Sequence, residues 1–408
     1  MKRGYLSEYF EGVAMKRLSA VDAEPARSNQ HEVGTTPAIR QFLGECKHQF
    51  PATFLWLGTE QDSFTEAGSL TMYDTRENQA HRSPEWRLYY PSNAVTEAMK
   101  EGDTLFLAKR TDDSVFFIVA PEGGSIADQL SWLFGFEGEP ELRFAAHEIA
   151  GDEDAELNFS ARLILDELGI EYEDPQANSL DSIVDRFGLK FPTTVEFSDL
   201  ARLTLPDIRA DENPDAALLA WLDHEEAMFR RLERKIVAER LGEGFTTGGE
   251  PDVDGFLRYS LEVQNRRKSR MGRAFENHLT AVFRSFSLRF EAQALTEQGN
   301  RADFLFPSSA AYHDEGFRAG KPTFLAAKST CKDRWRQVLP EAQKVWPKHL
   351  VTLEPAISTN QTSQMQAEQV QLVVPAAIQS SYREDQRAWL MSLADFVELV
   401  RSRERGSH

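Results

Sequence analysis

The hydrophobic and polar positions of this chain follow a different pattern in each half. Up to about residue 150, short runs rich in β-branched and aromatic residues alternate with Gly, Pro, Asn and Asp, which is typical of closely spaced strands. These runs are 54–57, 69–73, 86–90, 104–108 and 114–120. Two segments between them, 92–100 and 125–135, have the composition of short helices. The pattern predicts a mainly β domain, built as a barrel or a sandwich.

From about residue 151 the apolar positions recur with helical spacing. The predicted helices are 159–168, 178–187, 216–241, 273–286, 362–369 and 390–402, and the predicted buried strands are 303–306, 323–327, 349–353 and 370–374. A further helix is expected from about residue 333, with Pro340 starting a second helical segment. This half is predicted to be an α/β domain with a mixed sheet flanked by helices. We place the domain boundary near residue 175, between 150 and 190, which gives domains 1–175 and 176–408.

Length and charge refine this picture. A chain of 408 residues favours two domains over one. A net charge of −19 counts against a nucleic-acid-binding protein. However, the acidic residues gather in 137–156 and 207–226, whereas 266–273 holds five basic residues and no acid. Because the local field decides binding, the distribution is compatible with a protein that meets DNA on one face only.

Several classes of protein are disfavoured by what the sequence lacks. Its two cysteines, Cys46 and Cys331, cannot form a disulfide framework or a Cys-rich zinc site, and both are interpreted as small buried residues. No apolar run approaches about 20 residues and the N-terminus has no signal-peptide pattern, so we expect a cytoplasmic protein with no membrane partner. The glycine-rich segment 242–249 lacks the Lys-Ser/Thr of a phosphate-binding loop and is interpreted as a plain connection. No dinucleotide fingerprint, nucleophile elbow or zinc motif points to a metabolic enzyme.

The candidate chemistry lies on two neighbouring predicted strands. Asp303 begins one of them and Lys328 ends the next, an arrangement in which the carboxylate holds Mg²⁺ while the ammonium contacts a phosphate oxygen and the attacking water. In the common nuclease pattern a second acid stands two residues before the lysine, where this chain has Ala326. The missing acid must come from elsewhere, with Glu341 and Glu276 as candidates. The alternative is that Asp303 is an ordinary turn residue and Lys328 a solvated strand end.

Four segments of the C-terminal half are similar to the EcoRII restriction endonuclease family. They are Asn265-Arg-Arg-Lys-Ser-Arg-Met-Gly272, Asp303-Phe-Leu-Phe-Pro-Ser308, Ala311-Tyr-His-Asp314 and Lys328-Ser-Thr-Cys-Lys-Asp-Arg-Trp-Arg-Gln337 with Glu341. The similarity is dense over 255–345 and extends thinly from residue 189 to the C-terminus. In the N-terminal half only Lys16-Arg-Leu-Ser-Ala20 with Asp22 and, faintly, Thr75-Arg-Glu77 resemble that family.

This resemblance implies a restriction-endonuclease-like (PD-(D/E)XK) catalytic domain in which the second acid is displaced onto a helix. Asp303 and Glu341 would be the metal ligands and Lys328 the catalytic lysine. Glu276 would be an accessory acid, and Tyr312 would lie in the neighbourhood of the active site. The implied cofactor is Mg²⁺.

The same stretch is expected to read DNA bases. Lys332 and Asp333 follow the catalytic lysine closely, and a Lys-Asp pair can donate to guanine and accept from cytosine. Arg334 would act likewise, although without the family a surface ion cluster is the simpler interpretation of all three. Four basic residues upstream would clamp phosphates or reach bases, the plainer alternative being contacts to the DNA backbone only. They are Arg266, Arg267, Lys268 and Arg270.

For the N-terminal half the resemblance implies a pseudobarrel that binds a second copy of the target as an allosteric effector. The autoinhibition idea attached to the family is that this domain covers the active-site cleft until effector DNA binds. Its candidate DNA contacts, each of which could also be an ordinary solvated side chain, are Lys16, Arg17, His31, Arg76 and Arg82.

The sequence therefore predicts a type II (type IIE) restriction endonuclease. It would cut double-stranded DNA at a short GC-flanked palindrome such as CCWGG, as a homodimer. A companion DNA methyltransferase would protect the host sites. The alternatives are an endonuclease of different specificity and a catalytically inactive DNA-binding regulator with a relic nuclease fold. The presence of Asp303, Lys328 and Glu341 argues against the relic.

Overall fold

The computed structural model describes residues 5–23, 31–58, 62–79, 81–149, 157–172, 180–314 and 322–405. These residues form two compact units: an N-terminal unit up to Tyr172, counted together with Ala356–Asn360, and a C-terminal unit that contains the rest. The boundary expected near residue 175 falls within 173–179, outside the described residues. Within the described ranges, no helix has the length and apolar character needed to span a membrane.

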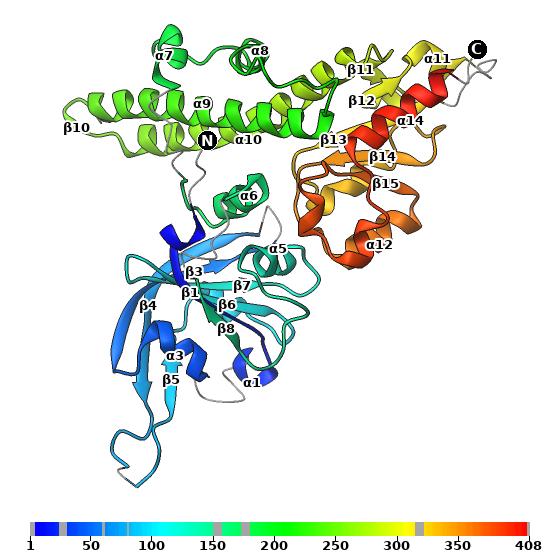
Figure 1. The fold of residues 1–408 in the computed structure, drawn as a ribbon. Helices are drawn as coiled ribbons and strands as arrows, with labels where there is room; N and C mark the ends of the chain where they lie inside the picture. The colour runs from blue at the N-terminus through cyan, green and yellow to red at the C-terminus, as the bar shows by residue number, and fades with distance from the viewer. Residues whose placement is uncertain are drawn as a thin grey trace. The chain divides into compact units, whose positions relative to one another are not determined.

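The N-terminal unit is built on an eight-stranded sheet with the order β2-β5-β4-β3-β7-β6-β1-β8 (Figure 1). Only the β3–β7 pair is parallel among these neighbours. The mainly β character predicted for this half is confirmed, whereas closure into a pseudobarrel stays a prediction, because β2 and β8 are the two ends of the strand order. The strands are β1 (Phe10–Arg17), β2 (Glu32–Gly34), β3 (His48–Trp56), β4 (Phe64–Asp74), β5 (Trp86–Tyr89), β6 (Thr104–Arg110), β7 (Val115–Ala120) and β8 (Ala145–Glu148).

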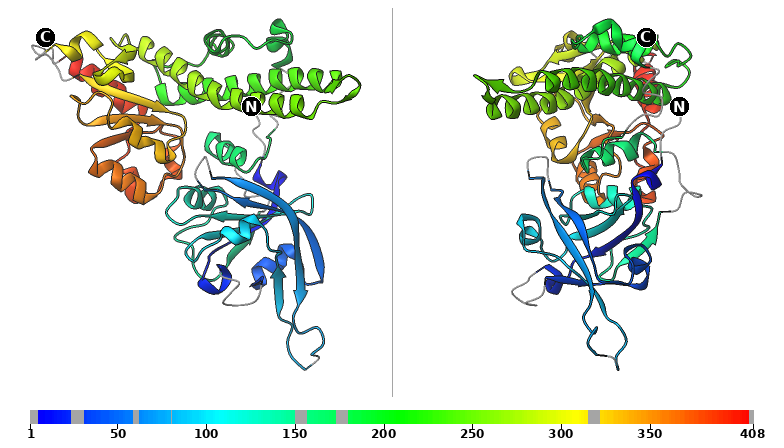
Figure 2. Two further views of the ribbon diagram at one scale, coloured as in Figure 1. Left: turned by 180° about the vertical axis from the view of Figure 1, so that it is seen from behind. Right: turned by 90° about the vertical axis from the view of Figure 1, so that its left-hand side faces the viewer.

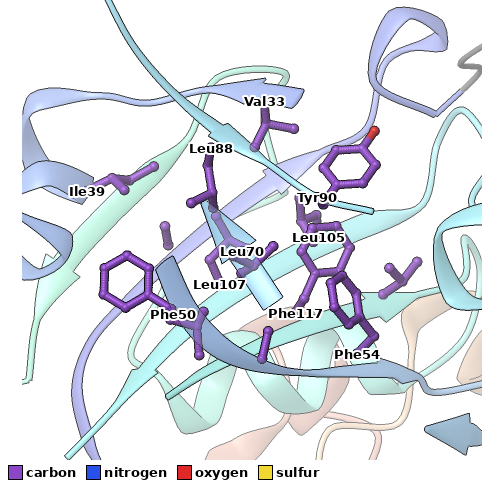
Figure 3. Close-up of a cluster of buried hydrophobic side chains, with 14 of the residues drawn as sticks. Val33, Ile39, Phe50, Phe54, Leu70, Leu88, Tyr90, Leu105, Leu107 and Phe117 are labelled. Carbon is purple, nitrogen blue, oxygen red and sulfur yellow. The ribbon is translucent and has the colours of Figure 1, made fainter. Parts of the chain in front are cut away.

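Each face of this sheet carries a buried apolar cluster. The residues of a strand alternate between the two clusters, because successive side chains point to opposite faces. Leu105, Leu107 and Phe117 belong to one apolar cluster, which Figure 3 shows together with Phe54 from β3 and Leu88 from β5. The residues that alternate with them on β6 and β7 belong to a second cluster, which includes residues of α5 (Ile126–Leu133) and α6 (Phe159–Glu167). The remaining helices of this unit are η1 (Leu6–Glu8), α1 (Ala20–Ala23), α3 (Pro37–Leu43) and α4 (Ala94–Ala98).

Two long helices, α9 (Pro214–Glu243) and α10 (Val253–Ser285), run side by side as an antiparallel hairpin in the C-terminal unit (Figures 1 and 2). Asn213 caps α9 by accepting from the Ala216 N–H at 3.0 Å, and Asp252 caps α10 in the same way. The sequence predicted only residues 273–286 of this region as helix, and the apolar residues in the first half of α10, among them Val253, Leu257 and Leu261, are exposed. The shorter elements around the hairpin are α7 (Asp181–Val184), η3 (Asp185–Phe187), α8 (Thr194–Leu203), β9 (Thr246–Thr247) and β10 (Glu250–Pro251).

The same unit contains a five-stranded mixed sheet with the order β11-β12-β13-β14-β15. The first two pairings are antiparallel and the last two parallel, which confirms the predicted mixed sheet. One face packs on α10 and α14, where the Phe283 ring lies 5.1 Å from that of Phe304. The elements are β11 (Glu291–Leu295), η4 (Glu297–Gly299), β12 (Arg301–Phe306), α11 (Ser309–His313), β13 (Thr323–Lys328), η5 (Lys332–Val338), β14 (Lys348–Thr352), α12 (Thr359–Ala367), β15 (Val370–Val373), η6 (Gln379–Ser381), α13 (Glu384–Arg387) and α14 (Leu393–Arg405).

Two local expectations are wrong. The segment after Lys328 forms the 3₁₀ helix η5, and residues 339–347 are turns and bends, so Glu341 does not lie on a helix. Ala342 has a left-handed φ of 45°, which is incompatible with a second helical segment starting at Pro340. Cys331 is buried as expected, but Cys46 is exposed, because it lies in the turn before β3.

Candidate active site

The central pair of the candidate site is Asp303 on β12 and Lys328 on β13. Leu305 pairs with Phe324 across these strands, and both Asp303 and Lys328 lie an even number of residues from that pair. Their side chains therefore share one face of the sheet. The Lys328 Nζ lies 3.0 Å from Asp303 Oδ2, which also accepts from the backbone N–H of Ala327 at 2.8 Å. The structure thus brings together the two residues singled out first in the sequence.

Gln293 on β11 connects this pair to a second acid. Its side-chain amide donates to Asp303 Oδ1 at 3.3 Å and to Glu276 Oε2 at 3.1 Å. Gln293 has a left-handed φ of 52°, uncommon for a residue other than glycine, and lies between the paired residues of β11. The sequence analysis missed Gln293, since a lone glutamine in a short strand carries no motif.

The electrostatics of the site are dominated by carboxylates. Burial, and then repulsion from Asp303, raise the pKa of Glu276 above its ordinary value. The same two causes raise the pKa of Glu341 to about 7, although Lys328 opposes the rise. The Glu341 Oε2 atom is buried and has no hydrogen-bond partner. We call Asp303, Glu276, Glu341 and Lys328 the acidic site, in which three carboxylates face one ammonium group.

These donors fit a hard divalent cation. Such ions prefer oxygen ligands, and Mg²⁺ usually takes one or two carboxylates together with waters and phosphate. The unpartnered oxygen of Glu341 and the mutual repulsion of the acids are features that a cation would relieve. Within the described part of the chain, no three Asp, Glu, His or Cys side chains converge closely enough to hold a metal by themselves. The fit is therefore to a metal held by Asp303 and Glu341, with solvent or substrate completing its shell.

Tyr312 lies on α11 and is engaged with the turn that follows Glu341. Its hydroxyl donates to the Glu297 carboxylate and accepts from the Lys344 N–H at 3.2 Å. The ammonium of Lys344 lies 5.5 Å from the centre of the Tyr312 ring. Tyr312 is thus in the neighbourhood expected for it, but its hydroxyl proton is committed to Glu297.

The basic segment of α10 is less available than the sequence suggested. Arg270 is 6% exposed, and its guanidinium bonds Glu225 at 3.1 Å and also pairs with Glu226, which counts against the DNA contact predicted for it. Arg267 is tied to the buried Glu233, at 2.7 Å from its Nε. The helix α10 turns both arginines toward acids of α9, and a desolvated ion pair is costly to break.

The exposed residues of this segment are Arg266 and Lys268. The Arg266 guanidinium stacks over the Phe191 ring at 4.2 Å. Arg266 also lines a cavity of about 550 Å³ together with Phe191 and Phe229. Arg266 and Lys268 remain available for the predicted DNA contact.

The residues after Lys328 are only partly described. The side chains of Lys332 and Asp333 lie outside the described part of the structure, although their backbone belongs to η5. Arg334 is exposed on the same 3₁₀ helix. The base-reading role expected for this segment stays a prediction.

Lys16 is the least accessible of the N-terminal candidates. It is 8% exposed, forms an ion pair with Asp22 at 2.8 Å and lies 5.2 Å above the Phe144 ring. A buried and paired lysine of β1 supports the fold, which counts against the DNA contact predicted for it.

The other N-terminal candidates differ in exposure. Arg76 and Arg82 lie in the loop between β4 and β5, which projects from the sheet in Figure 1. Arg76 pairs with Glu85, whereas Arg82 is exposed and donates to the Gln79 side chain at 3.2 Å. Arg17 pairs with Glu122, and His31 packs edge-on against the Tyr90 ring at 5.7 Å.

Comparison with known families bears directly on the acidic site. Residues 229–397 match the family model described as EcoRII C terminal. This part of the chain is similar to the EcoRII C-terminal family. All four residues of the acidic site fall inside it, as do Gln293 and Tyr312. The resemblance recognised in the sequence is thereby confirmed for this part of the chain.

A curated relative extends the match. Over 230 residues the chain is 37% identical to the type II restriction enzyme EcoRII of Escherichia coli. The match covers 56% of this chain and 55% of the relative, so the chain spans about half the length of that protein.

Solved structures of restriction endonucleases show weaker likeness. Metal-depleted Ecl18kI in complex with uncleaved, modified DNA has a TM-score of 0.46 and 18% identity, covering 56% of this chain and 85% of that one. The PspGI–substrate DNA complex has a TM-score of 0.44 and 14% identity, covering 53% and 94%. The B3 domain of UbaLAI with cognate DNA has a TM-score of 0.22 and 15% identity, covering 36% and 91%.

Proposed function

We propose that this protein is a type II restriction endonuclease that hydrolyses phosphodiester bonds of duplex DNA with Mg²⁺. The observation that supports this most directly is the pairing of Asp303 with Lys328 on one sheet face, inside the part of the chain that is similar to the EcoRII C-terminal family. The 37% identity to a type II restriction enzyme supports the same activity. The Asp303–Lys328 pair is surrounded by two further acids, Glu276 and Glu341, which an ordinary surface ion pair would not need.

In this proposal each residue of the acidic site has a distinct task. Asp303 and Glu341 would hold Mg²⁺. When bound, the metal would neutralise the phosphate charge and lower the pKa of the attacking water. Lys328, fixed by Asp303 at 3.0 Å, directs an ammonium proton to a phosphate oxygen and orients the attacking water. Glu276 is held by Gln293, and its raised pKa suits a group that receives a proton from that water.

The proposed target is a short GC-flanked palindrome such as CCWGG. Support comes from the position of Lys332, Asp333 and Arg334, which follow the catalytic lysine by a few residues and have the donors and acceptors that read a G·C pair. A palindrome is cut most simply by two active sites related by a two-fold axis, so we propose a homodimer. A companion methyltransferase would protect the same site in the host.

For the N-terminal unit we propose binding of a second copy of the target, which stimulates cleavage. Arg76 and Arg82 are the favoured contacts, because both lie on the projecting β4–β5 loop and Arg82 is exposed. Arg17 and His31 are secondary candidates. Autoinhibition by this unit is a further part of the proposal.

The decisive experiment is cleavage of a long DNA of known sequence by the purified protein in Mg²⁺, followed by sequencing of the fragment ends. Discrete ends that share one motif are expected, and they give the site and the stagger. The Asp303→Asn protein is the matched negative control. No cleavage by the wild-type protein, even with short CCWGG duplexes added as effector, would refute this proposal, and a binding selection on random DNA would then identify a non-catalytic DNA-binding protein.

A further inference from the structure

The segment that carries Glu341 has no regular structure of its own. Residues 339–347 form turns and bends between η5 and β14, and Ala342 is held at a φ of 45° although it is not glycine. A non-glycine residue in this region costs free energy and persists only where its surroundings enforce it. We call residues 339–347 the Glu341 turn. The position of the Glu341 carboxylate therefore depends on groups outside this turn.

The first of these groups is Glu297, in the connection between β11 and β12. Its carboxylate accepts from the Gln343 N–H at 3.3 Å and from the Tyr312 hydroxyl. Burial alone would raise the pKa of Glu297, but hydrogen bonds, that from Tyr312 foremost, hold it below its ordinary value. The charged carboxylate is thus the form that binds the turn. The neighbouring Asn300 adds a bond to the Pro340 carbonyl at 3.3 Å.

Tyr312 and Lys348 hold the same turn from two other elements. The Tyr312 hydroxyl accepts from the Lys344 N–H at 3.2 Å. The Lys348 ammonium is fully buried and donates to the carbonyl oxygens of Ala342, at 3.0 Å, and of Glu341. Lys348 shares the face of the sheet that bears Lys328, where it lies 5.2 Å above the Phe324 ring.

None of these bonds uses the Glu341 carboxylate itself. Its Oε2 atom has no partner, and Asp303 repels the carboxylate while Lys328 and Lys348 attract it. A turn with few bonds would relax away from this position. The bonds from Glu297, Tyr312 and Lys348 act on the backbone from Glu341 to Lys344 and oppose this relaxation.

We propose that Glu297, Tyr312 and Lys348 are positioning residues that hold the Glu341 turn, so that its carboxylate is preorganised to ligate a divalent cation beside Asp303. This inference rests on the metal-dependent activity proposed above. It assigns to Tyr312 a role that acts through Glu341 rather than on the substrate. Removing a group that orients a ligand typically lowers metal affinity or activity by about 10- to 100-fold.

The test is Tyr312→Phe, which removes one hydroxyl and keeps the ring. Binding of Mn²⁺ to the full-length protein, followed by electron paramagnetic resonance, should weaken about tenfold. The half-saturating Mg²⁺ concentration for cleavage should rise by the same factor, while kcat at saturating Mg²⁺ and KM for DNA stay within about twofold. Amide hydrogen exchange in a peptide covering 339–347 should accelerate, because Lys344 loses its acceptor. Tyr73→Phe is the matched control, since its hydroxyl also donates to a glutamate, Glu32, in the N-terminal unit.

A double-mutant cycle separates positioning from a direct role. If Tyr312 acts through Glu341, adding Tyr312→Phe to Glu341→Gln should leave Mn²⁺ affinity unchanged. A full additional loss in that background, or a fall in kcat with an unaltered metal dependence, would overturn the inference. If the Tyr312→Phe protein does not fold, Glu297→Gln tests the same bonds by the same measurements.

The two proposals fail separately. Metal affinity and hydrogen exchange do not depend on cleavage. If the wild-type protein cuts no DNA but the Tyr312→Phe variant binds Mn²⁺ more weakly than wild type, the endonuclease proposal is refuted and the positioning role is supported. If the wild-type protein cuts DNA and the Tyr312→Phe variant equals it in all three measurements, the endonuclease proposal is supported and the positioning role is refuted.

Discussion

Two clusters of charged side chains in the C-terminal unit differ in their balance of charge. The first joins α8, α9 and α10, and we call it the helix ion network: Arg202, Glu225, Glu226, Arg270 and His278. In it each acid faces a basic group, with His278 Nε2 at 2.9 Å from Glu225 and Arg270 at 3.1 Å from the same carboxylate. The Arg202 guanidinium, which can only donate, lies 2.8 Å from His278 Nδ1, so His278 accepts there and carries its proton on Nε2.

The pKa shifts show what this difference means. Burial would raise the pKa of Glu225, but the hydrogen bond from His278, helped by Arg270, holds it below its ordinary value. In the acidic site burial raises the pKa of Glu276 and Glu341, and Asp303 raises both further. In the helix ion network the acids are balanced by neighbouring basic groups. In the acidic site Lys328, Lys348 and Arg273 offset the repulsion only in part, so the pKa values of Glu276 and Glu341 stay raised, as expected for a site that would take up a proton or a cation.

The largest expected effect follows from removing the central charges of the acidic site. Asp303→Asn or Lys328→Ala should lower the cleavage rate by about a thousandfold or more, because each takes away charge stabilisation that no neighbour replaces. Specific DNA binding in Ca²⁺ should persist, and the free energy of unfolding should change little for Asp303→Asn, since a repulsive group is removed. The measurements are cleavage time courses and thermal unfolding. A near wild-type cleavage rate for either variant would show that the site assignment is wrong.

The helix ion network should respond in the opposite way. Arg270→Met leaves Glu225 and Glu226 without their guanidinium, so the free energy of unfolding should fall by about 3 to 5 kcal/mol. The cleavage rate per folded molecule should remain within a few-fold of wild type. Denaturant unfolding measures the first quantity and cleavage at low temperature the second.

The control for this prediction is Arg266→Ala, four residues earlier on the same helix and exposed. It should leave stability nearly unchanged and weaken DNA binding. If Arg270→Met weakened DNA binding without loss of stability, Arg270 would be a DNA contact after all, and charge balance would not distinguish the two clusters.

The sequence could predict part of this contrast. The side-chain alternation of a strand follows directly from residue numbers, so Asp303 and Lys328 could be placed on one face without a structure. The partners of Arg267 and Arg270 lie some 35 to 45 residues earlier, and nothing in 266–273 reveals them. One signal was available: Glu225 interrupts the apolar face of α9 near Leu222 and Met228, and a buried acid requires a buried cation.

The Glu341 turn shows where prediction from the sequence ends. A helix was expected there because Pro340 is compatible with a first helical turn. The observed conformation is set instead by contacts with Glu297, Tyr312 and Lys348, which come from three other elements. Gln293 escaped notice for the same reason, since its backbone at positive φ, not its residue type, directs the amide to Asp303. In the N-terminal unit, β8 was missed because Ala-Ala-His-Glu has little strand propensity.

A smaller effect concerns pH. Glu341 has a pKa of about 7 in the folded protein against 4.5 for the ordinary group, so the metal-free folded state binds this proton more tightly than the unfolded state. Its contribution to stability is fully present below about pH 4.5 and is lost as pH rises through 7. Glu341→Gln should therefore be more stable than wild type at pH 8 in EDTA, on the order of 1 to 3 kcal/mol, and equal to it near pH 5. Glu368→Gln, an exposed glutamate on the same unit, is the control. A stability difference independent of pH would mean that Glu341 is not strained by its neighbours.

The smallest expected effect extends the same criterion to the N-terminal unit. Lys16 is buried and paired with Asp22. Burial would raise the pKa of Asp22, but the hydrogen bond from Lys16 helps to hold it below its ordinary value. Arg82, by contrast, is exposed and donates to the neutral side chain of Gln79. Arg82→Ala should weaken binding of a CCWGG duplex and reduce the slope of log affinity against log salt by about one, because one phosphate contact is lost. Its free energy of unfolding should stay within about 0.5 kcal/mol of wild type. Lys16→Met should do the reverse, lowering stability without altering the salt slope. Equal salt slopes for wild type and Arg82→Ala would remove Arg82 from the DNA contacts, and balance of charge would then identify structural basic residues without identifying functional ones.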